Sequence, residues 1–287
     1  MYGARGSAKR VSPAQATRPN GPVASFSEAC PDLGQPCYDA CVEHGFVRGV
    51  RLERERVPDF GRYPFDIPAV RDLETLDLDP GVTFFIGENG SGKSTLLEAI
   101  AIILGLNPEG GSQNFTLAER PSESELHRYL TPIRSHRRPR RRFFLRAESL
   151  FNVATEVERL GLIGDMALGW EALHERSHGE AFLWLLRDRF LPGGLYLLDE
   201  PEAALSPKRQ LAMLTRMHDL VEGGPQLLIA THSPILMAYP GACIYELDEE
   251  GLKRVRYEDT EHVQITRDFL AQPARFLKHL LDDGSGR

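Results

Sequence analysis

The chain has 287 residues, of which 41% are hydrophobic and 26% charged, as in a globular protein that buries its core without disulfides or metals. Its formal net charge of −7 argues against a protein that coats nucleic acid over its whole surface, although a local basic patch is compatible with it. The polar N-terminus lacks a signal peptide and no apolar run approaches the roughly eighteen residues of a membrane helix, so we expect a cytoplasmic protein without an integral membrane segment.

Residues 1–44 are rich in proline, glycine, serine and alanine and show no sustained hydrophobic period, so we interpret them as a disordered N-terminal extension. Their cysteines, Cys30, Cys37 and Cys41, have no histidine among them and match zinc spacings poorly, which favours reduced thiols. Order is predicted to begin at Gly45, with a half-buried strand over residues 46–52.

Apolar runs alternate with helix-forming segments over the rest of the chain. The runs 82–86, 195–198 and 227–230 are typical of buried strands in a parallel sheet. Helices are predicted over 94–104, 207–221 and 266–281, a hairpin over 244–257, and a largely helical insertion over about 110–190. The pattern predicts an α/β fold in which a mixed or parallel sheet is flanked by helices, with a small helical subdomain.

Residues 87–94 fit the phosphate-loop pattern G-x-x-x-x-G-K-[ST] at every position. Glycines let successive backbone N–H groups surround phosphate oxygens, and the start of the following helix adds positive partial charge. Lys93 should reach the β- and γ-phosphates of ATP, and the Ser94 hydroxyl should bind Mg²⁺. The predicted nucleotide-binding residues are Gly87, Glu88, Asn89, Gly90, Ser91, Gly92, Lys93, Ser94 and Thr95.

Carboxylates and a histidine follow two other predicted strands. Asp199 could hold the magnesium ion, and Glu200 could act as a general base toward water. The alternative for Asp199 and Glu200 is a solvated acidic turn. The phosphate loop in the same chain favours the catalytic interpretation over it. His232 follows the run 227–230, where it could hydrogen-bond the γ-phosphate. The predicted catalytic residues are Glu200, His232 and Lys93.

These motifs resemble those of ABC-type P-loop ATPases, and most closely the soluble, RecF-like, AAA-type bacterial ATPases that are not transporters. The resemblance spans residues 45–257 and is carried by the segments 87–95, 197–207 and 230–234. It implies an ABC-type ATPase domain over residues 45–287, a Walker B Asp199 with catalytic Glu200, a D-loop at 203–206 and a switch histidine at His232.

Four further residues are assigned through this resemblance. Residues 176–180 match the signature L-S-G-G-Q in part, which implies that Ser177 and Gly179 contact a γ-phosphate held by a second chain; a helix N-cap at Ser177 is a compatible alternative. The Q-loop glutamine is absent, and Glu148 is its nearest replacement near the metal. Tyr63 is the best-placed aromatic residue to stack on adenine, with an ordinary core tyrosine as the alternative.

A signature motif in trans implies a head-to-tail homodimer around two ATP molecules. Only 106 positions separate Lys93 from Asp199 (199 − 93), too few for long coiled-coil arms. The segment Arg134–Arg142 holds six arginines, which could contact nucleic acid, an acidic partner or only solvent. We expect Mg²⁺-dependent ATP hydrolysis coupled to a DNA-related or defence role, with an unknown protein partner. A transporter's nucleotide-binding subunit and a slow ATP-gated binding switch remain alternatives.

Overall fold

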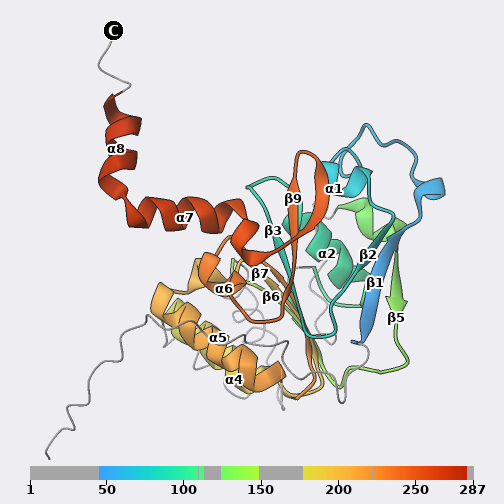
Figure 1. The fold of residues 1–287 in the computed structure, drawn as a ribbon. Coiled ribbons are helices and arrows are strands. Elements are labelled where there is room, and N and C mark those ends of the chain that lie inside the picture. Colours follow the sequence, from blue (N-terminus) through green and yellow to red (C-terminus); the bar gives the residue numbers. More distant parts are fainter. Residues whose placement is uncertain (1–44, 109, 113–123, 149–176, 222, 283–287) are drawn as a thin grey trace, which may run out of the picture. The chain divides into compact units, whose positions relative to one another are not determined.

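The computed structural model describes residues 45–108, 110–112, 124–148, 177–221 and 223–282 (Figure 1). The predicted N-terminal extension and its three cysteines lie outside these ranges. Within them, no helix combines the length and the apolar character that crossing a membrane requires.

A seven-stranded mixed sheet forms the centre of the domain. Its five inner strands are mutually parallel, and an antiparallel strand lies at each edge, β10 (Gly251–Val255) and β4 (Gly111–Ser112). The predicted mixed sheet flanked by helices is therefore confirmed. In spatial order, the parallel strands are β9 (Cys243–Asp248), β3 (Val82–Ile86), β8 (Gln226–Ala230), β7 (Leu195–Asp199) and β6 (Arg142–Arg146).

The inner strands are apolar throughout because both faces of the sheet are covered. Successive residues point to opposite faces, so Phe84 belongs to one buried cluster and Phe85 to the other. The first cluster includes side chains of α4 (His178–Arg189), α5 (Pro207–Val221) and α6 (Pro234–Met237). The second includes α2 (Lys93–Ile103), α1 (Pro68–Arg71) and a small antiparallel sheet of β2 (Thr75–Asp77), β1 (Val47–Leu52) and β5 (Leu130–Arg134).

The described part of the expected helical insertion is mostly not helical. Residues 111–146 contain strands β4, β5 and β6 and the 3-10 helix η2 (Glu125–Tyr129). In the described part of the expected insertion, α4 is the only α-helix. Strand β5 lies at the edge of its sheet and contains Pro132, which cannot donate a ladder hydrogen bond. Because of that proline, the hydrophobic pattern of the sequence does not predict the strand.

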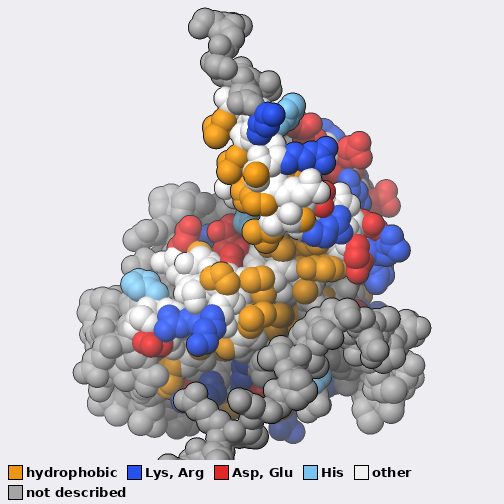
Figure 2. Space-filling model, turned by 60° about the vertical axis from the view of Figure 1, so that its left-hand side comes forward, with side chains coloured by type: hydrophobic (Ala, Val, Ile, Leu, Met, Phe, Trp, Pro, Cys, Tyr) orange, Lys and Arg blue, Asp and Glu red, His pale blue; other side chains and the backbone are white. Residues whose placement is uncertain are grey.

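The C-terminal segment forms two helices instead of the single one predicted over 266–281. They are α7 (Glu261–Ala271), which follows the 3-10 helix η5 (Tyr257–Asp259), and α8 (Pro273–Asp282). The break falls at Gln272 because Pro273 disfavours the helical conformation in the residue before it. Figure 2 shows hydrophobic side chains gathered along these helices. The exposed ones are Ile265, Phe269, Leu270, Leu277, Leu280 and Leu281.

Two of the six arginines in the basic segment bind the end of α2. Arg134 donates to the carbonyl oxygen of Ile103 at 3.2 Å, and Arg142 donates to that of Leu104 at 2.5 Å. Positive side chains at a helix C-terminus satisfy its last carbonyls and complement the helix dipole. These two arginines therefore have a structural role, while Arg138, Arg140 and Arg141 are exposed. Contact of this segment with nucleic acid stays a prediction.

Gln226 joins the N-terminal strand to the central sheet. Its side-chain oxygen accepts from the backbone N–H groups of Phe46 at 2.9 Å and Val47 at 3.0 Å. Its side-chain nitrogen donates to the carbonyls of Val47 at 2.7 Å and Asp79 at 2.9 Å. Gln226 is fully buried, and its amide supplies the hydrogen-bond partners that these backbone groups need away from water.

We predict that Gln226→Ala lowers the free energy of unfolding by about 3 kcal/mol, because it leaves several buried backbone groups without partners. Urea denaturation measures the effect. Gln264→Ala is the matched control, since Gln264 is exposed and donates only to the Glu258 carbonyl at 3.2 Å. Equal effects of the two substitutions would contradict the role assigned to Gln226.

Candidate functional site

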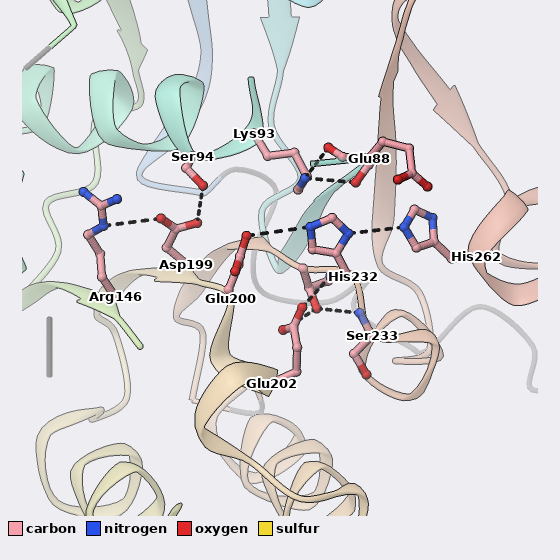
Figure 3. A network of polar contacts seen from close by, with 12 residues as sticks. Glu88, Lys93, Ser94, Arg146, Asp199, Glu200, Glu202, His232, Ser233 and His262 are labelled. Carbon is pink, nitrogen blue, oxygen red and sulfur yellow. Dashed lines mark hydrogen bonds and ion pairs between the residues drawn. The ribbon is translucent and has the colours of Figure 1, made fainter. Parts of the chain in front are cut away.

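Three polar loops meet where neighbouring parallel strands end. The phosphate loop follows β3, the Asp199–Glu200 pair ends β7, and His232 follows β8, which lies between them. Figure 3 shows these side chains facing one another from the start of α2, the end of β7 and the loop after β8. The structure thus brings together Lys93, Ser94, Asp199, Glu200 and His232, which the sequence places up to 139 positions apart (232 − 93).

The phosphate loop needs its first glycine for space and for conformation. Gly87 has φ of +140°, and a Cβ atom there would lie 2.2 Å from the carbonyl oxygen of Leu247. Only glycine fits so close to the backbone of β9. Lys93 begins the following helix and donates through Nζ to the carbonyls of Gly87 at 2.9 Å and Glu88 at 2.8 Å. The ammonium group thus lies along the loop itself.

Lys93 is only 3% exposed although it carries a charge. Burial lowers the pKa of its ammonium group, while the nearby negative charges of Glu200 and Asp199 act in the opposite direction. The two strand-end carboxylates thus compensate part of the cost of keeping this cation away from water.

Asp199 lies between a hydroxyl and a guanidinium. Its Oδ1 accepts a 3.0 Å hydrogen bond from Ser94 Oγ, and its Oδ2 lies 3.4 Å from Arg146 Nε. Arg146 also pairs with Glu98 on α2 at 3.1 Å. Burial raises the pKa of Asp199 to about 6, even though Arg146 and the Ser94 hydroxyl both lower it. The motifs in the sequence give no indication of Arg146. It reaches the site because it pairs with Asp199 in the register of β6 and β7.

Glu200 adopts a strained backbone conformation. Its φ of +48° is the one positive φ at a non-glycine residue in the part of the chain that the structure describes. Such left-handed conformations cost about 1–3 kcal/mol and tend to occur at functional sites. The backbone N–H of Glu200 donates to the Ala230 carbonyl at 2.9 Å, which fixes the turn to β8. Its carboxylate lies 3.7 Å from His232 Nε2.

The loop that carries His232 is held by Glu202. One oxygen of this carboxylate accepts from the Thr231 hydroxyl at 2.7 Å, and the other accepts from the His232 backbone N–H at 2.5 Å. Burial raises the pKa of Glu202, and these two hydrogen bonds act against that rise. The sequence motifs assign no separate role to Glu202. The only indication of its role is that a third carboxylate follows the Asp199–Glu200 pair within two positions.

A second histidine, which the motifs did not indicate, lies against His232. His262 on α7 has its Nε2 atom 3.3 Å from His232 Nδ1. Burial lowers the pKa of His232, the neighbouring Lys93 ammonium adds to the effect, and the Glu200 carboxylate acts against it. The imidazole of His232 is therefore held in its neutral form at this sheet edge.

The partial signature motif lies at the start of α4. Ser177 is the N-cap, and its backbone N–H bonds to Glu180 Oε2 at 3.1 Å in a capping box, as the alternative interpretation expected. Gly179 packs so tightly that a Cβ atom would lie 2.8 Å from the carbonyl oxygen of Ala204 in the predicted D-loop. The helix start and the D-loop are therefore in direct contact. Contact of Ser177 and Gly179 with a second chain stays a prediction.

Tyr63 and Glu148 lie close to the loops. Tyr63 is 60% exposed, so the alternative of a core tyrosine is wrong. It lines a surface hollow together with Asn89, Thr95 and Glu200, and its hydroxyl is 3.3 Å from Thr95 Oγ1. Glu148 is exposed in the turn after β6, and its negative charge contributes to the raised pKa of Asp199. Adenine stacking and metal binding by these two residues stay predictions.

The raised pKa of Asp199 makes the stability of the metal-free protein depend on pH. The folded state disfavours the ionised carboxylate, so stability falls as pH rises from about 4 to about 6. We predict that Asp199→Asn is more stable than the wild type at pH 7 by about 3 kcal/mol, and that the difference closes near pH 4. Denaturant titrations in EDTA at several pH values measure it. The exposed Asp268→Asn serves as the control, and a difference that does not change with pH would contradict the prediction.

Two families match parts of the chain. Residues 60–150 match a family described as "AAA domain", and residues 181–238 match one described as "AAA domain, putative AbiEii toxin, Type IV TA system". The first match contains the phosphate loop and β6, and the second begins within α4 and contains β7 and β8 with the loops that follow them. No curated protein matches the chain.

Solved structures resemble this chain with low sequence identity and low TM-scores. One is titled "An inward-facing conformation of a putative metal-chelate type ABC transporter"; it is 18% identical over 65% of this chain and 76% of its own, with a TM-score of 0.39. Another is an SMC head domain from Thermotoga maritima, 16% identical over 63% of this chain and 92% of its own, with a TM-score of 0.34. Scores this low do not by themselves define a shared fold. The two AAA matches, the glycine loop and the acidic strand end on this sheet support the resemblance to P-loop ATPases of the ABC, RecF-like type.

Proposed function

We propose that this chain hydrolyses ATP to ADP and phosphate with Mg²⁺ as the metal ion. The observation that carries the proposal is the convergence of Lys93, Asp199 and Glu200 at one sheet edge, beside a loop built to surround phosphates. A cation, a metal-binding carboxylate and a general base are the three groups that phosphoryl transfer to water requires.

Residues of the phosphate loop would bind the nucleotide. Lys93 would exchange its bonds to the loop carbonyls for bonds to the β- and γ-phosphates, since its Nζ atom already lies at the loop. Ser94 and Asp199 offer oxygen atoms 3.0 Å apart, the ligand type that Mg²⁺ prefers, with Glu148 as a further candidate. When bound, the metal ion would neutralise charge on the phosphate oxygens. Tyr63 would stack on adenine from the rim of the hollow.

Glu200 would act as the general base. Its carboxylate would accept a proton from the attacking water as the oxygen bonds to the γ-phosphorus, and ADP would leave with the electron pair of the broken P–O bond. The side chain is only about one third exposed, and it faces the Nε2 atom of His232. His232 would therefore lie beside the base, where its Nε2 atom could bond a γ-phosphate oxygen.

A head-to-tail homodimer would complete each site. The exposed Ser177 at the start of α4 would reach the γ-phosphate held by a second chain. The contact between Gly179 and Ala204 supports this arrangement, because the start of α4 and the D-loop are neighbours in one chain. ATP would then link two copies, and its hydrolysis would release them.

We propose that dimerisation serves a DNA-related or defence role in the cytoplasm, with a protein partner of unknown identity. The second family description, which names a toxin of a toxin–antitoxin system, accords with defence. The exposed Arg138, Arg140 and Arg141 accord with a nucleic-acid contact. A transporter subunit or a slow ATP-gated switch are the alternatives.

We predict that Glu200→Gln lowers kcat for phosphate release by about 100-fold or more, because it removes the proton acceptor. ATP affinity should change by less than about threefold, since Lys93 and the loop N–H groups remain. Fluorescent nucleotide titration and a phosphate-release assay measure the two quantities. Glu250→Gln, in the exposed turn between β9 and β10, is the matched control. Undiminished turnover in Glu200→Gln would refute the assignment of the base.

We predict that Lys93→Ala and Ser177→Arg are each inactive alone and recover turnover when mixed. In a head-to-tail pair, the loop of the Ser177→Arg chain would meet the intact signature of the Lys93→Ala chain, which rebuilds one whole site. A mixture of Lys93→Ala and Glu200→Gln should stay inactive, because both changes affect residues that a single chain contributes to its own site. The dimer proposal fails if Ser177→Arg alone turns over like the wild type and ATP-bound Glu200→Gln sediments as a monomer.

A further inference from the structure

His262 lies in line with the base and the switch histidine, although it belongs to none of the three sequence motifs. His232 Nδ1 is 3.3 Å from His262 Nε2, and the ring centroids are 5.5 Å apart. On its other side, His232 Nε2 is 3.7 Å from Glu200 Oε1. Figure 3 shows the three side chains in a row that runs from α7 to the end of β7.

A hydrogen bond between two neutral imidazoles requires an N–H on one ring and a lone pair on the other, so two arrangements exist. If His232 Nδ1–H were the donor, His262 would carry its proton on Nδ1, a buried atom with no hydrogen-bond partner among the described residues. The lone pair of His232 Nε2 would then also face the negative Glu200 carboxylate. Both consequences are unfavourable, because an unpaired buried N–H and a lone pair facing an anion each cost free energy.

The opposite arrangement leaves the buried Nε2–H of His232 without a hydrogen-bond partner instead, but it removes the lone pair that faces Glu200 and turns the N–H toward that carboxylate, 3.7 Å away. When His262 Nε2–H donates, the proton of His232 lies on Nε2 and points toward Glu200. The unpartnered atom of His262 is then a lone pair, and buried acceptors without partners are tolerated better than buried donors. The lowered pKa of His232 accords with a neutral ring in this position.

The first turn of α7 is anchored to the loop that carries His232. Thr260, the N-cap of α7, is fully buried and donates to the Tyr257 carbonyl at 2.8 Å. The Tyr257 hydroxyl in turn donates to the carbonyl of Pro234 at 3.2 Å, in the short helix that follows His232 and Ser233. His262 therefore keeps a fixed place beside His232 instead of occupying a mobile chain end.

We propose that His262 is a positioning residue that holds His232 in the tautomer with its proton on Nε2. In that tautomer the Nε2–H of His232 points toward Glu200 and, with ATP bound, can donate to a γ-phosphate oxygen. In the other tautomer it would present a lone pair to the phosphate and repel it. The kinetic consequence rests on the ATP hydrolysis proposed above, whereas the tautomer is a property of the nucleotide-free protein.

The experiment compares the full chain with His262→Phe, which keeps a ring but removes the donor, and His262→Gln, whose amide N–H can replace it. His279→Phe makes the same chemical change at an exposed position of α8 and is the control. Nitrogen-15 NMR of His232 without nucleotide should place the proton on Nε2 in the wild type and in His262→Gln, and lose that preference in His262→Phe.

Turnover should follow the tautomer. We predict that His262→Phe lowers kcat about tenfold with KM for ATP changed less than about twofold, while His262→Gln and His279→Phe stay near the wild type. Thermal melting of each variant reports whether it folds. A wild-type His232 with its proton on Nδ1 overturns the proposal even if His262→Phe does not fold, and so does a His262→Phe protein with wild-type kcat. A wild type without ATPase activity would refute the proposed function while leaving the NMR test intact.

Discussion

The site depends on the order and direction of three strands. β8 lies between β3 and β7 and runs parallel to both, and its last residue, Ala230, pairs with Phe85 on one side and Asp199 on the other. Because side-by-side parallel strands end at the same edge, the three loops that follow have to meet there. Lys93 and Asp199 are both buried at that edge, and the negative charges of Glu200 and Asp199 act against the lowering of the Lys93 pKa by burial.

This arrangement lowers the stability of the fold at the place where chemistry is proposed. A carboxyl group whose pKa rises to about 6 and a glutamate in a left-handed conformation both disfavour the folded state. The hydrogen bonds from Ser94 to Asp199 and from Thr231 to Glu202 offset part of that cost. An active site commonly trades stability for function in this way, and the apolar clusters on the two faces of the sheet supply the surplus.

The sequence could predict the parts whose signals are local. The glycine loop, the carboxylates after β7 and the histidine after β8 each follow an apolar run of the length that a buried strand needs, and the runs themselves predicted the mixed sheet. Helix α5 was predicted with its observed ends because Pro207 is compatible with a first helical turn. Local residue types were sufficient in these cases.

Other features were hidden because their causes lie far away in the chain. Arg146 meets Asp199 through strand register, His262 meets His232 through the packing of α7, and Gln226 bonds residues 180 positions earlier. An arginine, a histidine or a glutamine carries no local sign of such a partner. The edge strand β5 was missed for a different reason, since Pro132 interrupts the short run Leu130–Arg134 that forms the strand.

The position of β3 has a consequence for how the protein is made. Among the described strands, β3 pairs only with β8 and β9. The first residue of β8, Gln226, comes 140 positions after Ile86, the last residue of β3 (226 − 86). At about 5–20 residues per second, the ribosome needs roughly 7–28 s to add that length of chain. The phosphate loop thus emerges before the strands that pair with β3, and the edge that holds it forms only after β8 and β9 have been made. A fragment that stops before β8 contains the whole nucleotide motif but lacks the sheet that positions it.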